Sequence, residues 1–471
     1  MHATATRMLY RLLGASQICA PEWLEDDVSL EEVRVALDWC SSPGGDASLG
    51  VKLTAASAAV WFESSLLDEY RERLEDALQV LNAMPSPDPA LELQLRASLG
   101  DALMYTTGCS PRVTAAFNRT LQLAEQLGTT VHHKRALCCL WAARIGAADY
   151  ESAIGFAEAF GLVAGSSGDV AAVSLGDRMM AVAHHSAGSQ VIARSHAERA
   201  LSQPHWAMAP LNEGAFRFEP WVAGHAVFAR ILWVQGFPDQ AVRSGREALD
   251  RARSTGHALS LCYALPTFCT LLLLTGELPE AKRHIALLLE LSARHSLFYW
   301  HFWGRCLEVA LVRQNGETRT DHPVLRDPMC GPVHKEVLAT LSEGLTTRDA
   351  IVRAENGLSG WCAAELMRVR AERLLKDDGA NAVIAEEILQ HSLVTARQQG
   401  ARAWELRTAT SLARLWHEQH RSAEAHDLLT PVYEQFTEGF ATPDLVKAKT
   451  LLARLPGRLS PASRSPQDSL P

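Results

Sequence analysis

Residues expected to separate one helix from the next, mostly glycine, recur every twenty positions along this chain, starting with Asp68, Asp88, Gly108, Gly128, Ala148, Gly168 and Gly188. A helix of about fifteen residues and a connection of four or five fill such a step, and short connections make neighbouring helices antiparallel. Two steps therefore predict one helical hairpin. Because 471 residues are too many for a single hydrophobic core, we expect the hairpins to stack in a line.

The repeat is interrupted at two places. The first lies near residues 203–220, in a stretch rich in proline and aromatic residues, and the repeat then resumes at Gly236, Gly256, Gly276, Ser296 and Gly316. The second lies near residues 315–332, and the repeat resumes at Gly360, Ala380, Gly400 and His420. Proline breaks helices, so we interpret the first interruption as an insertion in a connection and the second as a long loop.

A small residue also recurs, because alanine follows several of these helix ends by five positions. The set is Ala153, Ala193, Ala241, Ala281 and Ala425. A small side chain there would let the two helices of a hairpin approach closely. Together with apolar residues at helical spacing and no strand-like alternation, this pattern favours tetratricopeptide-like repeats with lengthened helices.

The predicted fold is therefore all-α, a right-handed superhelical solenoid of about nine antiparallel helix pairs over residues 29–455. Residues 1–28 are expected to be a leader or the remnant of a preceding domain. Residues 456–471 are rich in proline and serine and are predicted to be a disordered tail. Function is expected in the concave groove that such a superhelix leaves open.

Composition narrows the classes of function and the compartment. A net charge of -9 and a pI near 6.1 argue against direct nucleic-acid binding. The ten cysteines lie mostly in apolar helical runs without a Cys-x-x-Cys motif, which is typical of reduced thiols. The sequence shows neither a signal peptide nor an uninterrupted membrane span. We therefore expect a cytoplasmic protein.

Several segments resemble one family, the helical-repeat half of bacterial predicted signal-transduction ATPases. The resemblance begins with Val33-Arg-Val-Ala-Leu-Asp-Trp39 and continues through Gly236-Phe-Pro-Asp-Gln-Ala241, Trp303-Gly-Arg-Cys306 and Gly400-Ala-Arg-Ala-Trp-Glu-Leu-Arg407 to Thr442-Pro-Asp-Leu445. It spans residues 22–453. It implies a tetratricopeptide-like fold and a role in signalling or transcription regulation, with a separate ATPase or regulator as the protein partner.

The chain departs from that family at its catalytic parts. No phosphate-binding loop of the Gly-x-x-x-x-Gly-Lys-Ser/Thr kind is present, so ATP hydrolysis does not follow from the resemblance. Residues 316–359 also keep little of the helix-pair pattern. The leading hypothesis is a non-catalytic protein-interaction scaffold or sensor module. The alternatives are a repeat domain that senses a small molecule, and the remnant of a longer ATPase or cyclase gene.

Two aromatic segments are candidates for the walls of a binding groove. The first is the run 298–303, with Tyr299, Trp300 and Trp303, and the second is the insertion between Trp206 and Trp221. Aromatic side chains anchor recognition surfaces. The competing interpretations are a helix that is simply buried on all sides and a surface loop held by its own aromatic residues.

No residue pattern indicates catalysis, a cofactor or a metal. His417 and His420 are three residues apart, whereas the zinc-binding helix of metalloproteases needs histidines four apart on one face. No Gly-x-Ser-x-Gly nucleophile motif is evident. The chain is therefore predicted not to be an enzyme.

Overall fold

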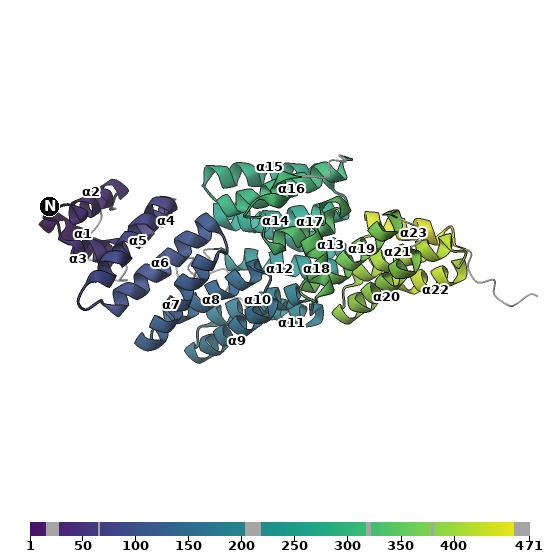
Figure 1. Ribbon diagram of the computed structural model, residues 1–471, viewed down its shortest axis with the longest axis horizontal. Coiled ribbons are helices and arrows are strands. Elements are labelled where there is room, and N and C mark those ends of the chain that lie inside the picture. The colour runs from purple at the N-terminus through teal and green to yellow at the C-terminus, as the bar shows by residue number, and fades with distance from the viewer. Residues whose placement is uncertain (16–27, 65, 203–217, 317–321, 378–380, 456–471) are drawn as a thin grey trace, which may run out of the picture.

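The computed structural model describes residues 1–15, 28–64, 66–202, 218–316, 322–377 and 381–455, and its regular elements there are all helices (Figure 1). The α-helices are α1 His2–Ala15, α2 Leu30–Ser41, α3 Ala47–Ala56, α4 Ala58–Glu63, α5 Leu67–Ala83, α6 Pro89–Thr107, α7 Pro111–Leu127, α8 Thr130–Gly146, α9 Tyr150–Ser167, α10 Val170–Ala187, α11 Gln190–Leu201, α12 Pro220–Val234, α13 Pro238–Ser254, α14 Ala258–Thr275, α15 Leu278–Arg294, α16 Phe298–Gln314, α17 Pro332–Leu341, α18 Arg348–Glu355, α19 Ala363–Asp377, α20 Ala382–Gln399, α21 Arg402–Glu418, α22 Ser422–Tyr433 and α23 Pro443–Leu452. The 3-10 helices are η2 Pro323–Arg326, η3 Glu343–Leu345 and η4 Gly360–Cys362.

Consecutive helices form antiparallel pairs that stack along the long axis of the molecule (Figure 1). The even-numbered helices α6, α8, α10, α12, α14 and α16 also contact one another in series, so they form one continuous inner layer. The odd-numbered helices α7, α9, α11, α13 and α15 cover it. The predicted tetratricopeptide-like solenoid is thus the fold of this chain.

From Gly108 onward the twenty-residue repeat corresponds to a backbone feature, the left-handed residue that ends a helix. The first two positions differ, because Asp68 lies in the first turn of α5 and Asp88 is the N-cap of α6. Gly108, Gly128, Gly168 and Gly188 all have positive φ, as do most of the later repeat glycines. In the described residues the non-glycine positions with positive φ are Ala148, Ser296 and His420, and all three belong to the same series. Left-handed backbone turns the chain out of the helix and into the next connection, which explains why glycine predominates there.

Replacing a strained repeat residue with glycine should stabilise the fold. Ala148 has φ 54°, a conformation in which an L side chain meets the following carbonyl oxygen. We expect Ala148→Gly to raise the free energy of unfolding by about 1 kcal/mol. Its neighbour Ala147 has φ -80°, so Ala147→Gly should instead cost about 0.5 kcal/mol. Urea unfolding of both variants tests this, and equal effects would contradict it.

The recurring alanines lie in the packed interior of the fold. Ala153, Ala193, Ala241, Ala281 and Ala425 are all fully buried, as close packing of the hairpins would require. The largest apolar cluster surrounds α12, α14 and α16 and extends to Trp404 of α21. The C-terminal pairs are therefore packed onto the central ones.

The superhelix returns onto itself in the middle of the chain. Helix α16 contacts α6, α17 contacts α8, and α12 contacts α21. At the first of these contacts a Cβ atom on Gly108 would lie 3.6 Å from the ring of Tyr299. The inner helices α6 to α16 therefore surround a central space.

Three details differ from or add to the expectations. About nine pairs, or 18 helices, were predicted for residues 29–455, whereas 22 α-helices, α2 to α23, lie in the described part of that range, including short ones such as α3, α4, α17 and α18. The segment 315–332 includes η2, and the shorter helices α17 and α18 follow where the pair pattern fades. Helix α1 lies in residues 1–28, and its residues Ala5, Met8, Leu9 and Leu12 are buried in one cluster with α2 to α6. The boundaries at 28 and 455 stay predictions.

Helix α14 is the most apolar of the described helices. By length and composition it is the one described helix that could cross a membrane, with 61% of its 18-residue window buried. It carries Leu265, Phe268 and Leu272, which belong to the largest core cluster. This burial accounts for its composition within the fold.

A candidate ligand-binding cavity on the superhelix axis

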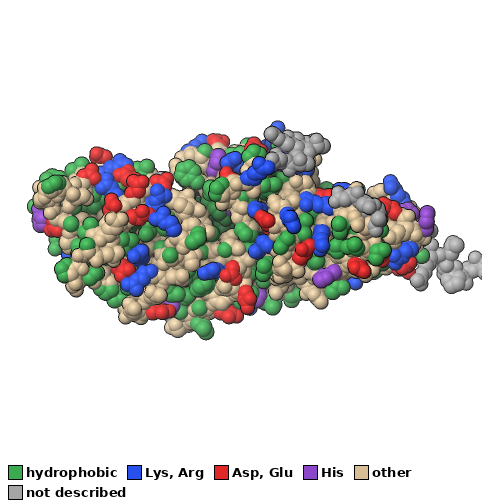
Figure 2. Space-filling view, in the orientation of Figure 1, with side chains coloured by type: hydrophobic (Ala, Val, Ile, Leu, Met, Phe, Trp, Pro, Cys, Tyr) green, Lys and Arg blue, Asp and Glu red, His purple; other side chains and the backbone are tan. Residues whose placement is uncertain are grey.

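A cavity of about 240 Å³ lies inside the ring of inner helices. Each of α6, α8, α10, α12, α14 and α16 contributes to its wall, and α17 and η4 add Val337 and Trp361. A groove of about 420 Å³ adjoins it, lined by residues that include Phe62, His257 and Phe298, and Tyr105 lines both spaces. Figure 2 shows this face hollowed between the N-terminal helices and the α14–α16 group.

Aromatic rings form much of the cavity wall. The ring centroids of Phe218 and Tyr263 are 4.3 Å apart, and that of Trp300 lies 5.7 Å from Tyr263 and 5.1 Å from Tyr299. Tyr299 and Trp300 are half-buried, and Trp303 is 8% exposed. Such walls present ring faces and edges to flat apolar groups.

Some of the aromatic residues predicted from the sequence line the cavity, and others do not. Tyr299, Trp300 and Trp303 are all in the cavity wall, while Phe302 of the same helix is in the core. Trp221 lies outside the cavity wall, where its ring is 3.9 Å from that of His225. Trp206 falls outside the described residues. That Tyr299, Trp300 and Trp303 bind a ligand stays a prediction.

Two arginines in the cavity wall have no partner among the described residues. Arg178 of α10 is 5% exposed, and Arg230 of α12 is half-buried. The Nε atoms of both are buried without a hydrogen-bond acceptor. Burial lowers the pKa of Arg230, although an arginine side chain still stays protonated at neutral pH. The described wall contains no aspartate, glutamate or lysine, so these two charges dominate its electrostatics.

His185 lies on the same wall as a neutral base. Its Nδ1 is 2.8 Å from Oε1 of Gln190, which can only accept, so Nδ1 carries the proton and Nε2 is left as an acceptor. Burial, with the charge of Arg230 nearby, lowers the pKa of His185 to about 3. The histidine therefore adds polarity but no charge at neutral pH.

The nearest buried carboxylate is already neutralised behind the wall. The hydroxyl of Tyr150, a cavity residue, donates to Glu336 at 2.7 Å, and Nε of Arg353 lies 3.2 Å from the same carboxylate. Burial raises the pKa of Glu336. This group fixes Tyr150 against α17 and α18 and leaves Arg178 and Arg230 without a counterion.

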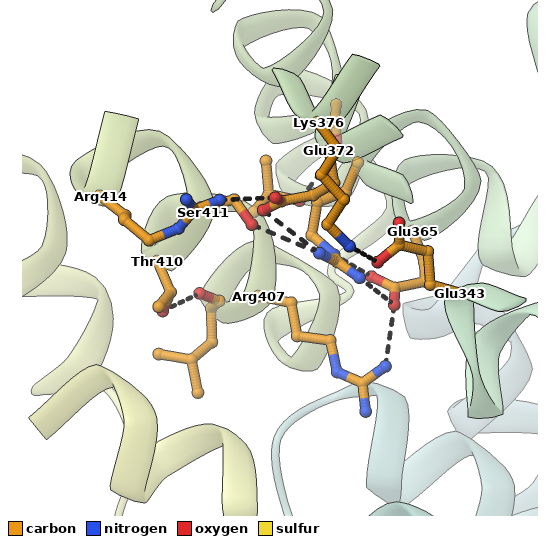
Figure 3. Close-up of polar contacts among 12 residues, drawn as sticks. Glu343, Glu365, Glu372, Lys376, Arg407, Thr410, Ser411 and Arg414 are labelled. Carbon is orange, nitrogen blue, oxygen red and sulfur yellow. Dashed lines mark hydrogen bonds and ion pairs between the residues drawn. The ribbon is translucent and has the colours of Figure 1, made fainter. Parts of the chain in front are cut away.

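A second, polar cavity between α19, α21 and α23 shows how this chain treats its other buried arginines (Figure 3). Arg407 donates to Glu365 at 2.9 Å and to Asp444 at 2.7 Å. Arg368 donates twice to Glu365, at 2.8 and 2.9 Å. Burial raises the pKa of Glu365, but the two arginines outweigh it and the net shift is downward. Paired arginines are the rule elsewhere, so the unpaired ones are a property of the central cavity.

A row of tryptophan rings connects the central cavity with the polar cavity. Trp233 and Trp361 line the central cavity, and Trp404 lies between them at 4.8 and 5.9 Å. The guanidinium of Arg407 lies 5.6 Å from the Trp233 ring centroid and 5.1 Å from that of Trp404. The ion pairs of Arg407 therefore help to fix the position of Trp233, which lines the central cavity.

Sequence reasoning found the aromatic wall but missed Arg178, Arg230 and His185. Arg178 and His185 lie seven residues apart, two helical turns, on an otherwise small and apolar stretch of α10. That spacing was the available signal. The spacing alone does not indicate a site, because the sequence does not show that α10 and α12 line the same cavity.

The described wall carries no pair of groups suited to acid and base catalysis. It lacks carboxylates, and its histidine has a low pKa. Among the described residues no group of three or more His, Cys, Asp or Glu is placed to hold a metal ion. The arrangement is suited to binding: a mostly apolar cavity with a few convergent polar groups.

No family model matches this sequence, and no curated protein matches it. Among the solved structures that match this chain are two Rap proteins and a tetratricopeptide domain. A Rap protein complexed with competence and sporulation factor has 9% identity and a TM-score of 0.48, covering 96% of this chain and 97% of that one. The Rap conjugation gene regulator of plasmid pLS20, in complex with the Phr* peptide, has 13% identity and a TM-score of 0.47, covering 74% and 98%. The tetratricopeptide domain of P58(IPK) has 12% identity and a TM-score of 0.26, covering 96% and 98%.

Proposed function

We propose that this chain is a non-catalytic sensor module that binds a small ligand in its central cavity. The observation that carries the proposal is the cavity itself. Residues of six inner helices line it, and they include aromatic rings and two arginines that have no partner in the described part of the chain. A natural ligand pocket is a concave, mostly apolar space with a few placed polar groups. We therefore favour small-molecule sensing, which was the alternative hypothesis from the sequence, over a scaffold that binds no ligand.

The protein partner enters the proposal as the receiver of the signal. Because inner helices that are far apart in sequence meet at the cavity, a bound ligand would favour the closed superhelix over more open forms. The outer helices carry exposed apolar side chains such as Val191, Ile192 and Val383, which suit contact with another protein. From the family resemblance we propose that this partner is a signalling ATPase or another regulator, in the cytoplasm.

Filling the cavity should abolish ligand binding without unfolding the chain. Thr267 of α14 is a half-buried wall residue, and Thr267→Phe would place a ring in the cavity. In a thermal-shift screen of a metabolite library, we expect at least one compound to raise the melting temperature of the native chain but not of this variant. Far-UV circular dichroism should show equal helix content.

The matched control is Val173→Phe, at an exposed position on α10 outside the cavity wall. This variant should keep every ligand-induced shift. A compound that stabilises all three proteins equally binds elsewhere and contradicts the proposal. If no compound stabilises the native chain while a partner protein is captured from its own cell extract, the scaffold hypothesis is favoured instead.

A further inference from the structure

The central cavity carries a net positive charge that the rest of the chain does not explain. The chain as a whole has a net charge of -9, and Figure 2 shows acidic and basic side chains interspersed over the visible face. In the described wall, by contrast, the ionised groups are Arg178 and Arg230 alone. The positive charge is therefore local to the cavity.

Unpaired buried charge is costly, and this chain avoids it at other sites. Arg135 is paired with Asp101, Arg353 with Glu336, and Arg407 with Glu365 and Asp444. A buried ion without a partner opposes folding, because its lost hydration is not replaced. Two such groups on one wall are best explained by a counterion that the ligand supplies.

The wall around these arginines also constrains the rest of the ligand. Arg230 lines the same cavity as Tyr150, Tyr263 and Tyr299, so its charge faces the space that the aromatic part of the wall encloses. Phe218 and Trp300 extend this part with rings at contact distance from Tyr263. An apolar, flat body would pack there while its charged end met the arginine.

We propose that the ligand is a small anion, with a carboxylate or phosphate group that pairs with Arg230 and Arg178 and an aromatic body held between Tyr263, Tyr299 and Trp300. This inference rests on the proposed function and adds the chemical class of the ligand. Arginine binds both carboxylate and phosphate through paired N–H donors, so the head group is left to the experiment.

Binding of four probes of similar shape tests the charge requirement. They are 1-naphthaleneacetate, its neutral amide 1-naphthaleneacetamide, the cation 1-naphthylmethylamine, and 1-naphthyl phosphate, each titrated into the full chain by calorimetry. We expect at least about tenfold tighter binding of the better anion than of the amide, and no binding of the cation. The tighter of acetate and phosphate identifies the head group. Inorganic phosphate alone should bind much more weakly.

The variants Arg230→Met and Arg178→Met remove one charge each and keep the side-chain volume. We expect each to lose the preference for the anion while still binding the amide, and to have a higher melting temperature than the native chain without ligand. A structural arginine would give the opposite shift in melting temperature. If one variant does not fold, the other still decides. Arg243→Met, at an exposed position on α13, is the control and should behave as the native chain.

The outcomes separate this inference from the proposed function. Equal affinity for amide and anion, abolished by Thr267→Phe, would overturn the anion inference and leave the cavity as a ligand site. Binding that Thr267→Phe does not affect, or no binding of any probe, would overturn the anion inference, whereas the proposed function is decided by the library screen with Thr267→Phe and Val173→Phe. A fall in melting temperature for both methionine variants would also overturn the anion inference.

Discussion

Arg407→Met should destabilise the C-terminal helices by about 3 kcal/mol, which is the usual cost of breaking a buried ion pair by removing one partner. The reason is the carboxylates that would be left behind. Glu365 is 1% exposed, and Asp444 accepts from Arg407 at 2.7 Å. Arg407 also donates to the backbone oxygen of Thr340 at 3.0 Å, so α21 would lose its links to both α17 and α23.

The control for this variant lies on the same helix. Arg414 pairs with Glu372 at 2.5 Å and with Glu418 at 3.2 Å, but its side chain is 43% exposed. Water screens such a pair, so Arg414→Met should cost less than about 1 kcal/mol. Hydrogen exchange of the amides of α19 to α23 measures both variants locally, which suits a repeat protein whose parts can open separately. Equal loss of protection in the two variants would contradict the argument.

Acid should destabilise the centre of the molecule between pH 6.5 and 3, through two buried histidines. Burial lowers the pKa of both His185 and His334 to about 3. Both rings are neutral in the fold, whereas in the unfolded chain they take up a proton near pH 6.5. The unfolded state therefore binds more protons in this window, and stability falls as the pH falls. At pH 5 the expected loss is about 2 kcal/mol for each histidine.

His334→Phe isolates one of the two contributions. His334 lies between the rings of Phe302 and Trp303, 5.1 and 4.2 Å away, and neither of its ring nitrogens has a partner among the described residues. Phenylalanine suits that environment and cannot titrate. We expect the loss in free energy of unfolding between pH 7 and pH 5 to be about 2 kcal/mol smaller in this variant than in the native chain, as measured by urea unfolding. His391→Gln, at an exposed position, should behave as the native chain, and an unchanged pH dependence in His334→Phe would contradict the argument.

The helical repeat could be predicted from sequence because its signals are local. A left-handed residue at Gly128 or Gly276 and a small residue at Ala241 leave their mark within a few positions of the helix end they create. Even the positions where another residue stands in place of glycine, Ala148, Ser296 and His420, could be predicted, because they fall on the twenty-residue step. The aromatic run at 299–303 was recognisable for the same reason.

The candidate site could be predicted only in part, because its other half depends on distant contacts. Arg178 and Arg230 lie 52 residues apart, and no local pattern shows that α10 and α12 turn them toward the same space. The helices α6 and α16, which are in contact, are even further apart in the sequence. Whether they meet depends on the sum of the small rotations between successive helix pairs. The number of helices was also underestimated, because short ones such as α17 and α18 do not fill a whole step.

The contact between α6 and α16 gives the molecule a particular mechanical character. An open helical solenoid stretches like a spring, since each repeat touches only its neighbours and small rotations add along the chain. Here the two ends of the central turn are joined, so a pull along the axis must first separate Tyr299 from the α6 end near Gly108 before the turn can lengthen. The central turn is therefore stiff, while the helices on either side of it stay compliant.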